Sequence, residues 1–194
     1  MTDDSIQQAR LGTIEKAEGD TRVLRYERRL DHPIDRVWSA LTEPDQLSLW
    51  LAAADELELV EGGRIALRWL NVPDSPQEWE QEHGIELGDA DPAEPAIGTI
   101  TELDPPRVIE YDTDKMGRMR WELRPEGDGC VLTFTNTVEL PEEFPAAQTL
   151  AGWHIHLDHL VDALAGRPPE WSTWTEDHMA EWERIRDRYE ARDG

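Results

Sequence analysis

The feature that most constrains the fold is a long apolar stripe at helical spacing within Gln148–Ala165. Its members recur three or four residues apart: Leu150, Trp153, Leu157, Leu160, Val161 and Leu164. This spacing places them on one face of an α-helix. Gly166 and Pro168 follow, which is typical of a helix end. A helix with such an apolar face must be covered by another element.

Short alternating segments precede this helix and predict β-strands. The first, Thr21–Leu30, is followed by two short helical patterns, Pro33–Thr42 and Asp45–Leu51. Six more strand patterns come next: Glu56–Val60, Arg64–Leu70, Ile97–Leu103, Arg107–Thr113, Arg118–Arg124 and Cys130–Val138. The pair Gly62-Gly63 predicts a hairpin between two of them. The order β-α-α-β6-α predicts an α+β protein whose curved antiparallel sheet wraps around the long C-terminal helix.

The chain divides into three expected parts. Residues 1–20 are polar and predict a flexible N-terminal arm, residues 21–166 form the domain, and residues 167–194 form a helical extension. An extra C-terminal helix, about Trp174–Ala191, carries one apolar side: Trp174, His178, Trp182, Ile185 and Tyr189. This side packs either on the domain itself or on a partner, as a homodimer contact, since aromatic side chains are common at interfaces. The Pro- and acid-rich segment Asn71–Pro95 predicts a long loop.

The charge balance excludes some classes of partner. The chain has 43 acidic and 19 basic residues and a net charge of −24. Phosphate backbones and anionic membrane surfaces would be repelled, so we expect no nucleic-acid binding. The acidic surface either maintains solubility or steers a cationic partner. The chain offers no membrane span and no secretory signal, and Cys130 is its one cysteine, so we expect a cytoplasmic protein without disulfides.

Four segments carry a resemblance to a known family. They are Glu27–Leu51 (ERRLDHPIDRVWSALTEPDQLSLWL), Ile97–Tyr111 (IGTITELDPPRVIEY), Trp121–Phe134 (WELRPEGDGCVLTF) and Gly152–Leu164 (GWHIHLDHLVDAL). In this order they resemble bacterial homologues of the activator of the heat-shock-protein-90 ATPase, which belong to the START-like (SRPBCC) superfamily. The resemblance implies a helix-grip fold with a hydrophobic ligand cavity. Relatives in the superfamily include lipid carriers, polyketide cyclases and co-chaperone domains.

The candidate ligand site is the space between the sheet and the long helix. Aromatic walls with a few polar groups are typical of small-molecule pockets. The expected lining residues are Tyr26, Arg28, Trp50, Trp69, Tyr111, Trp121, Trp153, His154 and Leu157. Arg28 shares strand parity with Leu24, Tyr26 and Leu30, so we expect it to point inward. It either anchors a ligand carboxylate or phosphate, or pairs with an acidic residue of the protein.

No motif in the chain assigns a reaction. The P-loop, the Rossmann glycine pattern and the GxSxG elbow are absent from the sequence. His154, His156 and His159 lack a metal-binding pattern, so we expect no metal and no cofactor. The sequence therefore favours a binding domain for a small hydrophobic or amphipathic ligand. The alternatives are a co-chaperone-type interaction module, and an enzyme of the cyclase or hydrolase kind that uses His154 or Tyr26 with Arg28.

Overall fold

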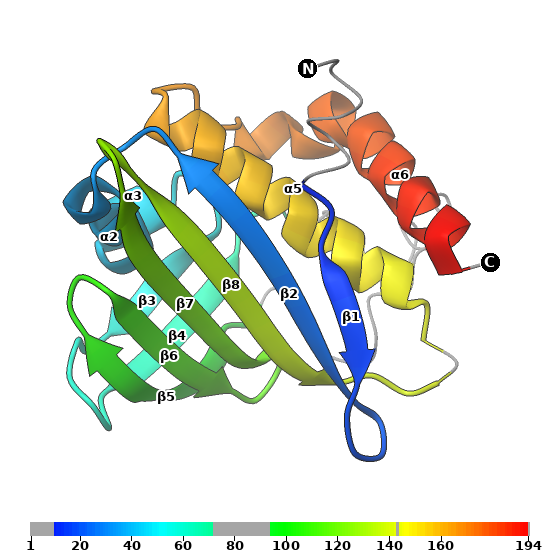
Figure 1. Cartoon of the computed structure of the whole chain (residues 1–194), viewed down its shortest axis with the longest axis horizontal. Helices are drawn as coiled ribbons and strands as arrows, with labels where there is room; N and C mark the ends of the chain where they lie inside the picture. Colours follow the sequence, from blue (N-terminus) through cyan, green and yellow to red (C-terminus); the bar gives the residue numbers. More distant parts are fainter. Residues whose placement is uncertain (1–9, 72–93, 143, 194) are drawn as a thin grey trace.

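The computed structural model describes residues 10–71, 94–142 and 144–193 (Figure 1). Within these residues one antiparallel sheet has the order β1-β2-β8-β7-β6-β5-β4-β3. Its strands are β1 (Thr13–Lys16), β2 (Thr21–Leu30), β3 (Ala52–Leu57), β4 (Arg64–Trp69), β5 (Ala96–Asp104), β6 (Val108–Thr113), β7 (Gly117–Glu126) and β8 (Gly129–Glu139). The strands from β3 to β8 form a meander, and the N-terminal pair β1–β2 joins it beside β8.

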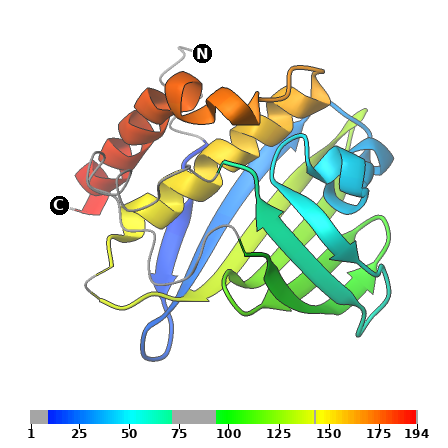
Figure 2. The ribbon, with the colours of Figure 1, turned by 180° about the vertical axis from the view of Figure 1, so that it is seen from behind.

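The helices lie on one side of this sheet (Figures 1 and 2). Helices α2 (Ile34–Thr42) and α3 (Pro44–Leu47) connect β2 to β3, and α5 (Ala146–Leu164) lies across the sheet (Figures 1 and 2). A 3₁₀ turn, η1 (Trp171–Thr173), leads into α6 (Trp174–Asp193), which packs against α5 beside the β1 edge of the sheet. The expected α+β architecture, a curved sheet around a long helix with an extra helix behind it, is confirmed.

Side chains alternate along the strands as their sequence predicts. In β2 the buried positions are Leu24, Tyr26, Arg28 and Leu30, and the residues between them are exposed. Helix α5 is buried on more than its predicted stripe, because α6 covers a second side of it. His154 and His159 contact α6, whereas His156 packs against Trp50, Trp69 and Trp171. All three histidines are buried, with 1%, 5% and 4% of their surface exposed. These histidines are part of the core, although histidine as a residue type is only intermediate in its tendency to be buried.

The N-terminal region differs from the expectation of a flexible arm. Residues 1–9 lie outside the described residues, but Thr13–Lys16 forms strand β1, which pairs with β2 from Thr13↔Arg25 to Lys16↔Arg22. The prediction was wrong for these four residues because Ile14 is their one apolar member. Such a short strand has no alternation to detect, and it forms by pairing with an edge that a longer strand already presents.

Other predicted element boundaries differ from the observed ones by a few residues. Strand β3 begins at Ala52 rather than Glu56, and α5 begins at Ala146 rather than Gln148. The expected acidic loop lies almost entirely outside the described residues. Among those described, neither α5 nor α6 combines the length and apolar character that a bilayer crossing requires.

Candidate functional site

Five aromatic rings meet between the sheet and α5, and we call them the aromatic cluster: Trp50, Trp69, Trp121, Phe134 and Trp153. Trp121 stacks on Phe134 with ring centroids 3.9 Å apart, and Phe134 lies 4.6 Å from Trp153. Trp50 approaches Trp121 edge-on at 5.6 Å, and Trp69 lies 6.0 Å from Trp153. Three strands (β4, β7 and β8) and the helix α5 each contribute one of these rings, and Trp50 follows α3. Together the five rings build one aromatic wall.

The indole N–H groups of the three buried tryptophans find partners inside the protein. Three indole N–H groups donate hydrogen bonds: Trp50 to the Ala40 carbonyl (2.8 Å), Trp121 to the Tyr111 hydroxyl (3.0 Å) and Trp153 to Asn136 Oδ1 (3.0 Å). Burial raises the pKa of Tyr111, so its hydroxyl stays protonated. The aromatic cluster therefore offers an incoming molecule ring faces and edges rather than these hydrogen-bond donors.

Trp69 is the partly exposed member of the aromatic cluster, whereas the other four rings are buried. Its indole stacks on the imidazole of His156, with centroids 5.0 Å apart and planes inclined by 28°. His156 Nδ1 lies 3.2 Å from the Trp50 carbonyl, to which it donates in the neutral tautomer. Burial lowers the pKa of His156 to about 4, so the ring is neutral at pH 7.

A second group of side chains, which we call the polar cluster, lies between β2, α5 and α6: Tyr26, Arg28, His154, Asp158 and Tyr189. Arg28 Nη2 is 3.5 Å from Asp158 Oδ1, and His154 Nε2 is 3.4 Å from Asp158 Oδ2. His154 Nδ1 lies 2.9 Å from the Tyr189 hydroxyl, and the Tyr26 hydroxyl donates to the Leu150 carbonyl at 2.9 Å. The network joins three elements that are distant in sequence.

Charge and burial oppose each other in the polar cluster. Burial lowers the pKa of Arg28, although Asp158 raises it in part. Burial disfavours the charged form of Asp158, but its contact with His154 and the charges of Arg28 and Arg10 outweigh this, and the pKa of the carboxyl lies below its usual value. Arg28 also donates to the Arg10 carbonyl at 2.6 Å. The inward Arg28 is thus paired with an acidic residue of the protein.

The residues expected to line a ligand cavity divide between these two groups. The aromatic cluster contains four of them, Trp50, Trp69, Trp121 and Trp153. Tyr111 accepts a hydrogen bond from Trp121 of this cluster. Tyr26, Arg28 and His154 belong to the polar cluster, and Leu157 is fully buried on α5. Tyr26 stacks on Phe134 at 6.0 Å and connects the two.

Sequence analysis did not name four residues of this region as site residues: Phe134 of the aromatic cluster, His156 that stacks on Trp69, and Asp158 and Tyr189 of the polar cluster. His156 could have been found from its spacing, because it lies one helical turn after Trp153 and shares its face. Asp158 is likewise one turn after His154. Nothing in the sequence pairs Tyr189 with His154, which it contacts across 35 positions.

The polar cluster brings Tyr26, Arg28 and His154 together, as an enzymatic use of these residues would require. Each of the three, however, has at most 3% of its surface exposed. A reacting group must be reached by substrate, so this arrangement by itself supports a structural network.

His159 anchors α6. Its Nε2 accepts a hydrogen bond from the Trp174 indole at 2.9 Å, and its ring centroid lies 4.7 Å from that of His178. Burial, and then the neighbouring His156 and His178, lower the pKa of His159 to about 3. No group of three or more histidine, cysteine or acidic side chains suited to a metal ion occurs among the described residues.

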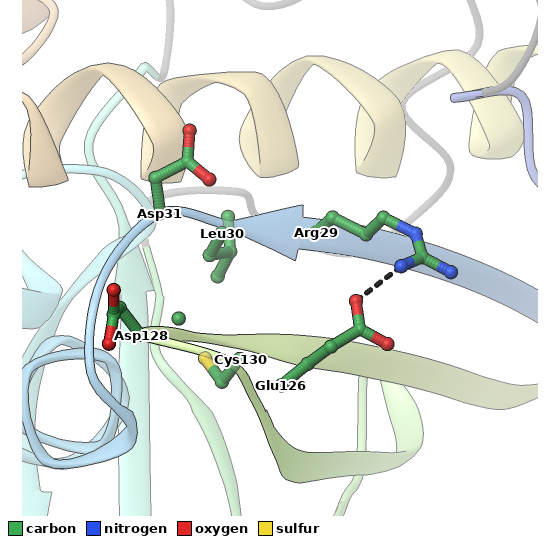
Figure 3. Close-up of a pocket in the computed structure, with 7 residues that line it drawn as sticks. Arg29, Leu30, Asp31, Glu126, Asp128 and Cys130 are labelled. Carbon is green, nitrogen blue, oxygen red and sulfur yellow. Dashed lines mark hydrogen bonds and ion pairs between the residues drawn. The ribbon is translucent and has the colours of Figure 1, made fainter.

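A separate surface hollow of about 270 Å³ lies where β2 and β7 end and β8 begins (Figure 3). Its lining residues are Arg29, Leu30, Asp31, Glu126, Asp128, Gly129 and Cys130. Arg29 pairs with Glu126 across it. Burial raises the pKa of the Cys130 thiol, which makes it a poor nucleophile at neutral pH. We assign this hollow no function.

The curved antiparallel sheet wrapped around α5 defines the START-like helix-grip class of proteins. Within this class the chain belongs to the Activator of Hsp90 ATPase homolog 1-like protein family, whose model matches residues 31–165. The family match ends one residue after α5, so α6 lies beyond it. Comparison with curated protein sequences found no match.

Solved structures of the same fold span most of the chain. A Bordetella parapertussis protein is 27% identical with a TM-score of 0.58, covering 89% of this chain and 91% of its own. CalU16 from Micromonospora echinospora is 24% identical with a TM-score of 0.60, covering 92% and 88%. The Aha1 dimer from Colwellia psychrerythraea is 16% identical with a TM-score of 0.53, covering 73% and 95%. The last two likenesses concern the fold alone.

Proposed function

We propose that this protein is a binding domain for a small hydrophobic or aromatic ligand, held at the aromatic cluster between the sheet and α5. The observation that carries the proposal is Trp69, a partly exposed indole at the margin of an otherwise buried aromatic wall. A ligand enters by displacing Trp69 from His156 and is held between the Trp69 and Trp153 rings. Aromatic walls of this kind bind through area and ring geometry.

The polar partners of the cluster limit which ligands fit. Because Trp50, Trp121 and Trp153 donate to internal acceptors, recognition relies on shape and apolar contact. A ligand with a polar end would place that end beside Trp69, where the protein meets solvent. Amphipathic molecules with a ring or an acyl chain are therefore the expected class.

The test uses the indole N–H signals of the nine tryptophans in a ¹H–¹⁵N NMR spectrum. Medium-chain fatty acids and naphthalene-sized aromatic acids are titrated into the protein. Binding at the proposed site shifts the Trp69, Trp121 and Trp153 signals and leaves that of Trp38, on α2, in place. If no compound shifts these three signals selectively, the proposal is wrong.

A matched pair of variants strengthens this test. Trp69→Leu removes one of the two rings that hold the ligand, and we expect affinity to fall about tenfold or more, as for an aromatic anchor of a binding site. Trp38→Leu removes a partly exposed tryptophan elsewhere and should leave affinity within about twofold. Equal affinities for the two variants would place the ligand away from Trp69.

A co-chaperone-type module is the second candidate, and the family description favours it. In that role the acidic surface would meet a basic patch of the partner. We would measure the ATPase rate of purified Hsp90 with and without this protein at low salt. A rate that stays unchanged at saturating protein removes this candidate.

A homodimer through α6 would need two chains to exchange that helix. Its apolar side chains Trp174, Trp182, Ile185 and Tyr189 are each at most 6% exposed, because they already pack within one chain. Sedimentation equilibrium distinguishes the two states, and a monomer mass at high concentration excludes the dimer.

We also infer a cytoplasmic location, which the lone buried Cys130 supports.

A further inference from the structure

The Tyr189 hydroxyl connects the two ends of the described chain. It accepts a hydrogen bond from the backbone N–H of Gly12 at 2.7 Å, and Arg192 donates to the Gly12 carbonyl at 3.3 Å. In each of these two hydrogen bonds the donor and the acceptor residue lie 177 or more positions apart in sequence. The last turns of α6 therefore hold the segment that leads into β1.

The same hydroxyl also bonds to α5. Burial raises the pKa of Tyr189 to about 12, so the hydroxyl keeps its proton at neutral pH. Since Gly12 already uses an oxygen lone pair, the remaining proton is free to be donated to His154 Nδ1, 2.9 Å away. His154 then carries its own proton on Nε2, which faces Asp158. Tyr189 is thus shared by the N-terminal segment, α5 and α6.

The N-terminal segment fits closely over β2. A Cβ atom at Gly12 would lie 2.3 Å from the Tyr26 ring, closer than packed atoms allow. Two residues earlier, the Arg10 carbonyl accepts from Arg28 at 2.6 Å. Glycine at position 12 lets the backbone approach the ring closely enough to reach Tyr189.

Polar atoms that lack hydrogen bonds are gathered beneath this contact. Within the described residues, five buried side-chain nitrogen or oxygen atoms have no hydrogen-bond partner, and four belong to the polar cluster: Arg28 Nε, Arg28 Nη2, His154 Nε2 and Asp158 Oδ1. Buried groups of this kind gain hydrogen bonds when water reaches them. Arg28 Nη2 and Asp158 Oδ1 make an ion pair at 3.5 Å but no hydrogen bond, so hydrogen bonds to water would offset part of the cost of opening the cover over the polar cluster.

We propose that residues 10–16 and α6 form a two-ended latch, in which Tyr189 makes each end hold the other and both are released together. Release exposes Arg28, His154 and Asp158 to solvent while the rest of the sheet and α5 stay folded. Gly166 at φ 76° and then Pro168-Pro169 end α5, so that α6 is a separate helix joined to it by this linker. The latch does not depend on the ligand proposed above.

Hydrogen exchange measured residue by residue by NMR tests the latch in both directions. Tyr189→Phe removes only the hydroxyl, and we expect amides of β1, a strand that pairs with β2, to exchange about tenfold faster. Gly12→Ala pushes the segment off Tyr26, and we expect amides in the last turns of α6 to exchange faster by a similar factor, because coupling between two sites is reciprocal. Amides of β6 and β7 should keep their rates in both variants.

A control separates latch release from general loosening of the N-terminal region. Gly19 lies in the β1–β2 turn at φ 62° with open space around it, and Gly19→Asn keeps that conformation without new contacts. This variant should leave α6 exchange unchanged. If Tyr189→Phe speeds exchange in α6 but not in β1, the two ends open independently and the latch is refuted. Unchanged rates at both ends would refute it as well.

Discussion

Replacing Asp158 by asparagine leaves a buried guanidinium without its counter-charge. The side chain of Arg28 is 2% exposed and that of Asp158 is 19% exposed, with 3.5 Å between Nη2 and Oδ1. Removing one partner of a fully buried ion pair costs about 3–5 kcal/mol. The partial exposure of Asp158, and the carbonyl of Arg10 that Arg28 keeps, reduce this. We expect a loss of about 2–3 kcal/mol in the free energy of unfolding.

The assay is urea unfolding of wild type and variants, followed by circular dichroism at pH 7. The matched control is Asp162→Asn on the same helix, which breaks an exposed pair with Arg167 at 2.7 Å and should cost about 0.5 kcal/mol or less. Equal losses for both variants would refute the reasoning. A double variant, Arg28→Met with Asp158→Leu, should recover much of the loss, because no unpaired charge remains.

The pKa values of His156 and His159, about 4 and about 3 in the folded protein, make folding sensitive to acid. Because the unfolded chain binds protons near 6.5 and the folded chain does not, stability is full above that pH and falls below it, by up to about 1.4 kcal/mol per pH unit for each histidine. Urea midpoints at pH 7 and pH 5 measure this, and His156→Asn should weaken the dependence; an unchanged dependence contradicts the assignment. Separately, Gly98→Ala puts a Cβ 2.0 Å from the Asp112 carbonyl oxygen of β6, so we expect it to cost about 2 kcal/mol or more. Gly152→Ala, in open space on α5, should stabilise by up to about 1 kcal/mol, and a reversed order in thermal unfolding would contradict both.

Some residues of the candidate site could be predicted from the hydrophobic pattern within single strands and helices. The parity of β2 predicted that Arg28 points inward, and the faces of β4, β7 and α5 predicted that Trp69, Trp121 and Trp153 belong to one aromatic wall. These inferences succeed because a strand repeats every two residues and a helix every 3.6, so the side facing the core can be read within one segment. The same reasoning selected His154 for the cavity, whereas His156 is the histidine that stacks on Trp69.

The sequence by itself determined the order of elements, the central position of α5 and the inward faces of the strands, because each depends on periodicity over a few consecutive residues. Only the tertiary structure decided which buried polar groups meet. The pairing of Arg28 with Asp158, and of Tyr189 with both Gly12 and His154, joins residues far apart in the chain. Such contacts depend on where α6 packs, which is set by the shape of the assembled core rather than by any local pattern.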